Sequence, residues 1–145
     1  MSVAQIGRNV GLLTAVILLS LSAAACGPKL PDAADPIQAR PIGLSELNRQ
    51  VSRLDRKGKT ELGKTPVLVT GHVVAIADGA ATVVSLDEKY SPAAVNTKGK
   101  AMCMFRVPPP PLEKGQKITV AGYVDKISIA DNILLIRCTV ASANP

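Results

Sequence analysis

Few side chains in this chain of 145 residues have the chemistry of a nucleophile, a metal ligand or an attachment point. The sequence holds three cysteines, one histidine and no tryptophan. Cys26 ends an uncharged apolar run, residues 10–26, that reads VGLLTAVILLSLSAAAC. Cys103 and Cys138 lie far downstream of this run, and His72 is the single histidine. The candidate chemistry of the chain is therefore mostly that of thiols.

The apolar run has the form of a secretory signal that ends at a lipid-attachment cysteine. Arg8, an apolar segment and a small-residue cleavage site are the parts of such a signal. The sequence Ala23-Ala24-Ala25-Cys26 resembles the lipobox of bacterial lipoproteins, in which the chain is cut before the cysteine and the cysteine is acylated. We therefore expect residues 1–25 to be removed and Cys26 to carry palmitate-type acyl chains. Two or more such chains hold a protein stably on a membrane.

Two alternatives to lipidation remain open at this stage. A conventional secretory signal would leave Cys26 as a spare thiol. An uncleaved anchor would need about 20 apolar residues, which is more than the run supplies. If Cys26 is acylated, Gly27 follows it in place of the Asp that typically retains such proteins in the inner membrane. Resemblance to Gram-negative sorting rules then implies the outer membrane, with the protein facing the periplasm.

The sequence after the signal predicts a tether and then one amphipathic helix. Residues 26–43 are rich in Pro and Ala and lack hydrophobic periodicity, which is typical of an extended linker. Apolar residues recur along one stripe of residues 44–57. They are Leu44, Leu47, Val51 and Leu54. Gly58 follows as a predicted C-cap, and we expect this helix to pack on the domain after it, with a short coiled coil as the alternative.

From Pro66 onward, apolar and polar residues alternate with a period of two, which predicts five strands. The predicted strands are residues 66–76, 81–86, 101–107, 117–127 and 132–140. Asp78-Gly79 predicts a hairpin turn between the first two strands. A long polar loop, residues 87–100, precedes the third strand. The prolines at 108–111 cannot donate ladder N–H groups, so they predict a rigid connector outside the sheet.

One pattern with a central glycine occurs twice, 51 residues apart. The segment V-x-V-x-G-x-V around Gly71 matches I-x-V-x-G-x-V around Gly122. A glycine inside a strand predicts a sharp bend or the close approach of another chain segment. Strands that bend at their middle are typical of small closed barrels. Gly71 and Gly122 are therefore predicted to be structural.

These glycine motifs, the preceding helix and the cysteines of the third and fifth strands resemble the tRNA-anti-like family of OB-fold proteins. The resemblance implies a mainly β fold, a five-stranded OB-fold barrel with one N-terminal amphipathic helix, over residues 44–141. It implies no activity on tRNA. OB-folds often place a helix between the third and fourth strands, where this chain has its prolines, so we expect the helix at 44–57 to cover one end of the barrel.

The OB strand order 1-2-3-5-4 makes the third and fifth strands neighbours, which brings Cys103 and Cys138 onto adjacent strands. Export and an even number of remaining cysteines predict a disulfide between them. Two buried free thiols and a metal site are the alternatives. No CxxC motif or suitably spaced histidine accompanies the pair, so we expect neither a metal nor a cofactor.

Catalysis and nucleic-acid binding have little support in the residues. The sequence contains no G-x-S-x-G motif, no phosphate-binding glycine loop and no convincing carboxylate pair, so we expect no enzyme activity. His72 falls on the outward face of its strand. Aromatic residues make up 2% of the chain, whereas OB barrels bind single strands largely by stacking bases on aromatics. The basic residues between 49 and 64 alternate with acidic ones, as on a solvated helix face.

The expected function is therefore that of a lipid-anchored, non-catalytic binding module of the cell envelope. Without its signal the chain carries 16 Lys and Arg against 11 Asp and Glu, which suits anionic surroundings. We expect a protein or envelope-polymer partner, bound through the polar strand face or the loop at 87–100. A carrier for a small ligand or cation is the alternative, and a single-stranded nucleic-acid binder is a more distant one.

Overall fold

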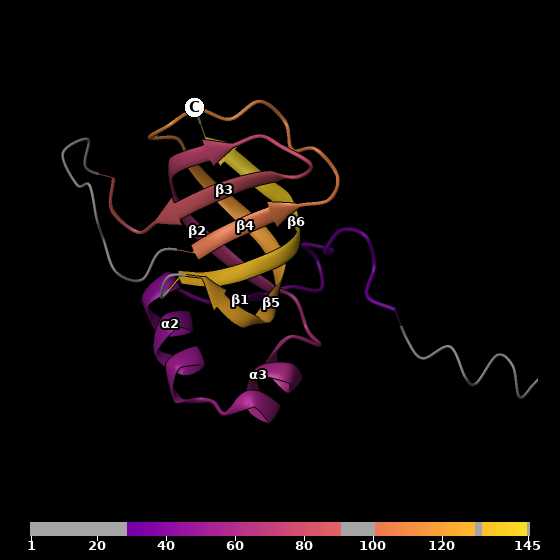
Figure 1. Ribbon diagram of the computed structural model, residues 1–145. Coiled ribbons are helices and arrows are strands. Elements are labelled where there is room, and N and C mark those ends of the chain that lie inside the picture. Colours follow the sequence, from indigo (N-terminus) through magenta and orange to yellow (C-terminus); the bar gives the residue numbers. More distant parts are fainter. Residues whose placement is uncertain (1–28, 91–100, 130–131, 145) are drawn as a thin grey trace, which may run out of the picture. The chain divides into compact units, whose positions relative to one another are not determined.

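The computed structural model describes residues 29–90, 101–129 and 132–144. Cys26, the predicted signal and most of the predicted polar loop lie outside these residues. The chain divides into two units, Met1–Leu30 and Pro31–Pro145, and all elements belong to the second (Figure 1). The helices are α2 (Leu44–Arg53) and α3 (Arg56–Leu62), and the strands are β1 (Arg40–Pro41), β2 (Val67–Ala77), β3 (Thr82–Asp87), β4 (Ala101–Phe105), β5 (Lys117–Ile129) and β6 (Asn132–Asn144).

Strands β2 to β6 form a closed barrel. Their order is β2-β3-β4-β6-β5, and β5 pairs with β2 to close the ring. All of these pairs are antiparallel except β4 with β6, which is parallel. This is the predicted order 1-2-3-5-4, so the prediction of a mainly β, OB-like five-stranded barrel is confirmed. The third strand ends at Phe105 rather than at Val107, because the prolines that follow cannot continue the ladder.

The interior of the barrel is filled by side chains that alternate along each strand. In β2 every second residue from Val67 to Val73 is buried, which is the pattern of a strand with one face in a core. The same alternation in β4 buries Cys103 and Phe105. Among the described residues, no polar or charged side chain is buried. The barrel therefore encloses an apolar core.

The prediction of one helix over residues 44–57 is wrong, because the chain forms two helices there. Leu54 adopts an extended conformation, with φ −88° and ψ 139°, and ends α2. Asp55 then begins α3, since its Oδ1 accepts a hydrogen bond from the N–H of Gly58 at 2.8 Å. An aspartate in this position caps a new helix, so Gly58 lies inside α3 and not at a C-cap.

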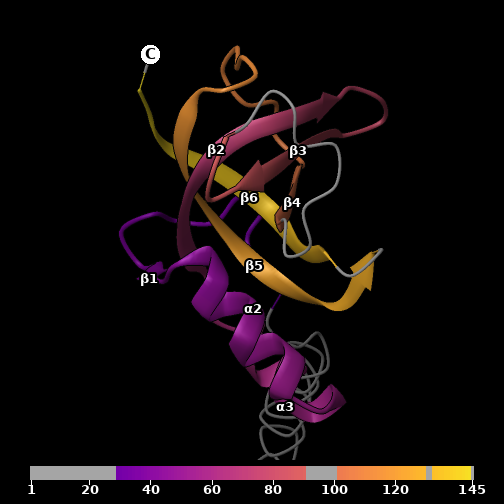
Figure 2. The ribbon, with the colours of Figure 1, turned by 90° about the vertical axis from the view of Figure 1, so that its left-hand side faces the viewer.

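Helix α2 covers one end of the barrel, as the sequence predicts. Its buried residues Leu44, Leu47 and Val51 belong to the same hydrophobic cluster as the strand interior. Figures 1 and 2 place both helices at this end, and the connection at 106–116 at the opposite end. Leu112 of that connection packs partly buried against the core. Each end of the barrel is thus closed by apolar side chains from outside the sheet.

The carboxylate of Glu88 joins the first turn of α2 to the end of β3. Its Oε1 accepts from the backbone N–H of Ser45 at 2.9 Å, and its Oε2 accepts from Ser45 Oγ at 2.7 Å. The first turn of a helix has N–H groups without an intrahelical partner. The helix has no side-chain cap of its own, so Glu88 supplies one from the barrel. These hydrogen bonds hold the pKa of Glu88 below its usual value.

Replacing Glu88 with Gln should destabilise the protein at pH 7 by about 0.5 kcal/mol, since the cap is solvent-exposed and its charge is screened. Because the pKa of Glu88 is lowered on folding, its contribution is fully present above the usual glutamate pKa. It is lost as the pH falls through the lowered value. Urea unfolding at pH 7 and at about pH 3 should show a difference between the two proteins that is larger at pH 7 than at the lower pH. An equal difference at both pH values would contradict this assignment.

The segment from residue 31 to residue 41, which we call the strap, packs on the barrel instead of forming an extended linker. Ala34 N donates to Arg137 O of β6 at 2.8 Å, and β1 pairs in parallel with the start of β2. Because β5 lies between β6 and β2, the strap crosses β5. This corrects the predicted tether at 26–43, whose second half is bound to the fold.

The small side chains of the strap explain why it can lie so close to the barrel. Ala34 and Ala39 are both buried, and a methyl group leaves room for the strap backbone to approach the sheet. Under the strap, Ala121 and Tyr123 of β5 are buried, although the alternation of the strand turns them outward. Alanine and proline are equally typical of a free linker, so the sequence alone does not mark this segment as packed.

Candidate binding surface

The outer face of β2, β5 and β6 carries two rows of polar side chains, which we call the polar face. Register pairing aligns His72 with Lys117 and Asn144 in one row, and Thr70 with Thr119 and Ser142 in the other. The hydroxyls of Thr70 and Thr119 are 2.8 Å apart and share a hydrogen bond. His72 lies on the outer face, as predicted, with its Nδ1 3.2 Å from Glu88 O. This surface offers donors and acceptors to a polar partner.

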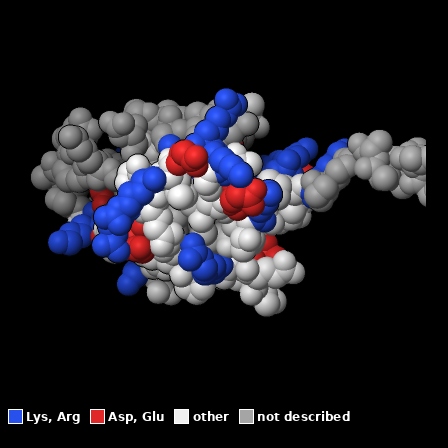
Figure 3. All heavy atoms as spheres, turned by 90° about the horizontal axis from the view of Figure 1, so that it is seen from below, with Lys and Arg blue, Asp and Glu red and all other residues white. Residues whose placement is uncertain are grey.

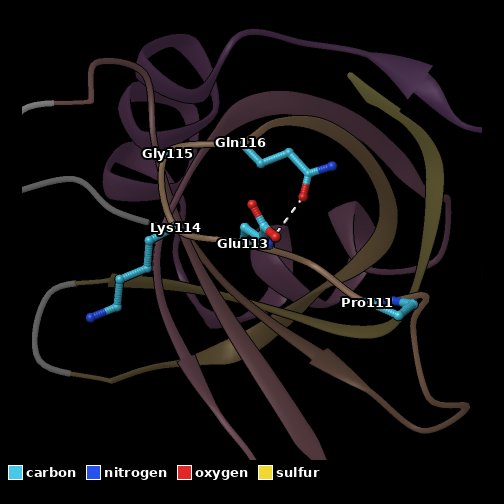
Figure 4. A pocket seen from close by; sticks show the side chains of 5 residues that line it. All are labelled: Pro111, Glu113, Lys114, Gly115 and Gln116. Carbon is cyan, nitrogen blue, oxygen red and sulfur yellow. Dashed lines mark hydrogen bonds between the residues drawn. The ribbon is translucent and has the colours of Figure 1, made fainter. Parts of the chain in front are cut away.

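A shallow hollow of about 540 Å³ lies at the end of the barrel opposite the helices (Figure 4). Its lining includes Glu113 and Gln116, whose side chains lie toward one another, while that of Lys114 points away. Glu113 N donates to Gln116 Oε1 at 3.0 Å. Gly115 has a φ of 85°, which favours glycine, and its N–H donates to Val73 O at 2.7 Å. The hollow is thus held in place by Val73, in the middle of β2.

A second hollow, of about 360 Å³, lies between the proline connector and the β2–β3 hairpin. Ile76 and Val84 line it from the strands, and residues 108–112 line it from the connector. Proline fixes the backbone φ and has no N–H, so residues 108–111 of this wall are rigid and offer no backbone donors. As the sequence predicts, the prolines lie outside the sheet.

The face formed by α2 and α3 carries both signs of charge (Figure 3). Arg49 forms an ion pair with Glu46, and Lys64 forms one with Glu61 at 2.7 Å. Hydrogen bonds from Gln50 and Arg49 lower the pKa of Glu46. The other basic residues of this stretch are Arg53, Arg56, Lys57 and Lys59. The mixture agrees with the expectation of a solvated helix face, although basic side chains are in excess.

Cys103 and Cys138 are free, fully buried thiols in this structure. Cys138 Sγ donates a hydrogen bond to Leu135 O at 3.3 Å. Burial raises the pKa of Cys138 well above its usual value, and the neighbouring Cys103 thiol raises it further. The fold thus brings the two sulfurs together without a bond between them. The disulfide remains a prediction for the exported protein.

Exported, unreduced protein should resist thiol labelling after denaturation, because the oxidising periplasm favours a bond between these two neighbouring sulfurs. The bond would close a loop of 36 residues and stabilise the fold by about 4 kcal/mol in the chain-entropy model. The measurement is the mass increase with a maleimide. Two labels on Cys103 and Cys138 after reduction are the reference. Two labels before reduction would mean that the thiols remain free.

Gly71 and Gly122 lie where other parts of the fold come too close for a side chain. A Cβ at Gly71 would lie 3.0 Å from Asp87 O and 3.0 Å from Leu44 Cδ1. A Cβ at Gly122 would lie 2.9 Å from Cys138 Sγ and 3.1 Å from Leu135 Cβ. Of the two roles that the sequence allows, a bend or a close approach, these distances support close approach.

The described part of the chain gives no sign of a metal centre or a spanning helix. No group of three or more His, Cys, Asp or Glu residues gathers there in a way that could hold a metal ion. None of the helices within the described ranges is long and apolar enough to cross a membrane. The predicted lipid-attachment residue, Cys26, lies outside those ranges.

Comparison with known proteins supports the fold. No family model matches the sequence, and a search of curated proteins finds no match. One similar solved structure is a lipoprotein from Klebsiella pneumoniae subsp. pneumoniae MGH 78578, for which nucleic-acid binding is a suggested activity. The alignment has a TM-score of 0.53 and 15% sequence identity, and it covers 73% of this chain and 94% of that one. The two chains thus share an architecture, while the resemblance to the tRNA-anti-like family stays a prediction.

Proposed function

We propose that this chain is a lipid-anchored binding module of the bacterial cell envelope, with no catalytic role, which contacts a protein or envelope polymer. The observation that carries this proposal is the apolar core of the closed barrel. Among the described residues no polar or charged side chain is buried, so no interior group is available to hold a polar ligand. Recognition must then take place on the outer surface of the barrel.

The lipobox-like sequence at Cys26 supports attachment to a membrane. Gly27, in place of an Asp after the cysteine, favours the periplasmic face of the outer membrane as the location. The structural neighbour from Klebsiella is itself a lipoprotein, so an anchored barrel of this architecture has a counterpart. The polar face is one proposed contact region, because it offers exposed hydrogen-bonding groups on the outside of the barrel. The loop at 87–100 is the other, on the ground of its polar sequence.

Nucleic-acid binding is the second candidate, because that activity is suggested for the neighbour. The aromatic residues of this chain argue against it. Phe105 and Tyr123 are buried, which leaves Tyr90 as the exposed aromatic of the three that the sequence contains. Single strands bind OB barrels mainly by stacking on several aromatics along a basic groove. A small-ligand carrier is less favoured, since the hollows described above are open surface features.

Crosslinking in intact cells, followed by affinity purification and mass spectrometry, tests the proposal. Residues 91–100 would be replaced by a Gly/Ser segment of equal length, which keeps Glu88 and its contact with α2. We expect one envelope partner to be captured by the native protein and lost in this variant. A Gly79→Ala variant is the control, because nothing lies within 4 Å of a Cβ at that position.

Two results of this experiment would contradict the proposal. Capture of abundant neighbours alone would argue against a specific macromolecular partner and favour the small-ligand carrier. Tight binding of the purified barrel to single-stranded DNA or RNA, weakening steeply as salt is raised, would favour the nucleic-acid alternative.

A further inference from the structure

The strap fixes the point at which the chain leaves the barrel toward Cys26. Arg137 Nη1 donates to Pro31 O at 2.9 Å, and Asp32 Oδ1 lies 2.9 Å from Arg106 Nη1 and 3.7 Å from Arg137 Nη1. Pro31 is five residues after Cys26. Even a fully extended chain of five residues spans only about 17 Å. A lipid on Cys26 would therefore keep this part of the barrel close to the bilayer.

We propose that the strap seats the barrel directly on the bilayer that holds Cys26, with Ile37 entering the lipid interface. The inference rests on the lipid anchor of the proposed function and adds to it the face of the barrel that meets the membrane. The occupant of this face is the lipid surface, because the short chain between Cys26 and Pro31 brings that surface within reach.

Ile37 is presented at the tip of a fixed turn. Two hydrogen bonds hold this turn. The backbone N–H of Ile37 donates to Asp35 Oδ1 at 2.9 Å, and Gln38 N donates to Asp35 O at 3.2 Å. The side chain is nevertheless 93% exposed. Such a turn projects an isoleucine outward without a partner in its own fold. It lies six residues after Pro31, which is again a short distance along the chain.

A second exposed apolar residue lies beside the same ion pair. The described large hydrophobic residues that are exposed are Ile37 at 93%, Val107 at 53% and Tyr90 at 43%. Val107 directly follows Arg106, the partner of Asp32. Single exposed apolar residues are common on protein surfaces, so exposure alone would carry no weight. Here two of the three lie on the strap or next to its ion pair, within reach of the proposed anchor.

The arginines at the strap also suit contact with a lipid surface. Arg106, Arg137 and Arg40 of the strap carry three positive charges, against the two carboxylates of Asp32 and Asp35. Basic side chains close to a bilayer are attracted by anionic headgroups. The apolar tip at Ile37 and the excess positive charge at the strap are thus the two features that an interfacial contact uses.

A depth measurement on the full-length lipidated protein tests the inference. The protein would be reconstituted in vesicles of phosphatidylethanolamine and phosphatidylglycerol that contain a nitroxide-labelled lipid as quencher. A fluorophore would be attached at Gln38→Cys, which leaves Ile37 in place, and at Gly79→Cys as the control in the open β2–β3 turn. Cys103 and Cys138 are buried in the folded protein and should not react. We expect quenching at position 38 to be several-fold stronger than at position 79.

Adding Ile37→Ser should reduce the quenching at position 38 at least twofold, because the apolar contact with lipid is lost. Equal quenching at positions 38 and 79 would overturn the inference. Quenching that Ile37→Ser leaves unchanged would contradict the proposed entry of Ile37 into the lipid interface. The mass of the reconstituted protein separates the two proposals. Protein without lipid that stays outside the vesicles would overturn the anchor and this inference together. Lipidated protein in the vesicles with no quenching at position 38 would overturn this inference alone.

Discussion

A Cys26→Ser variant should lose all incorporation of labelled palmitate and accumulate with residues 1–25 still attached. The predicted processing acylates the cysteine sulfur before the chain is cut, and serine has no sulfur to acylate. Each buried CH₂ of an acyl chain contributes about 0.8 kcal/mol to membrane binding, so the variant loses the anchoring energy of the acyl chains and keeps only that of the uncleaved apolar run. Metabolic labelling and the intact mass of the product are the measurements.

A Cys138→Ser variant is the matched control for this experiment. Cys138 is a buried core residue, so its replacement should leave the lipid label on the chain even if the fold is weakened. A wild-type protein that is cleaved but carries no lipid would instead indicate conventional secretion. A Cys26→Ser protein that is processed and membrane-bound like the wild type would contradict the lipoprotein prediction.

Replacing Gly122 with Val should destabilise the barrel by about 3 kcal/mol, or prevent folding altogether. The Cβ alone would lie 2.9 Å from Cys138 Sγ and 3.1 Å from Leu135 Cβ, both in a filled core. The valine methyl groups would add further overlap, and neither neighbour can move into a void. Chemical unfolding of the purified protein measures the loss.

Gly79→Val provides the control at an open position. No atom lies within 4 Å of a Cβ there, so its effect should stay within about 0.5 kcal/mol of zero. Similar unfolding free energies for the two variants would show that Gly122 is not needed for close packing. A large loss at Gly122 and none at Gly79 would assign the effect to the approach of β6.

The strands of the barrel could be predicted from the sequence because the patterns that specify them lie within short stretches of the chain. Alternating residues such as Val67 and Val69 indicate which face of a strand is buried, and Asp78-Gly79 indicates where a hairpin turns. The two glycine motifs predicted a small closed barrel. They lie on β2 and β5, which the structure pairs to close the ring. The strand order itself came from resemblance to a known family and not from the alternation.

The sequence also determined the chemistry by which the protein is proposed to be anchored. Cys26 and the alanines before it form a motif that needs no fold to be recognised, because processing enzymes act on the chain at that point. Only the tertiary structure decided how the rest of the N-terminal region behaves. Asp55 divides the predicted helix by capping a new one, and Glu88, just after β3 and 43 residues away, caps α2.

The strap is the clearest case of a feature that the sequence left open. Ala34 and Ala39 lie in a stretch that has the composition of a free linker, and no periodicity marks them as buried. They become buried because Arg137 on β6 and the start of β2 offer backbone groups at matching positions. Those partners are about 100 and 27 residues away along the chain. Local pattern thus determined the strands and the lipid-attachment motif, while long-range hydrogen bonding decided which part of the linker belongs to the fold.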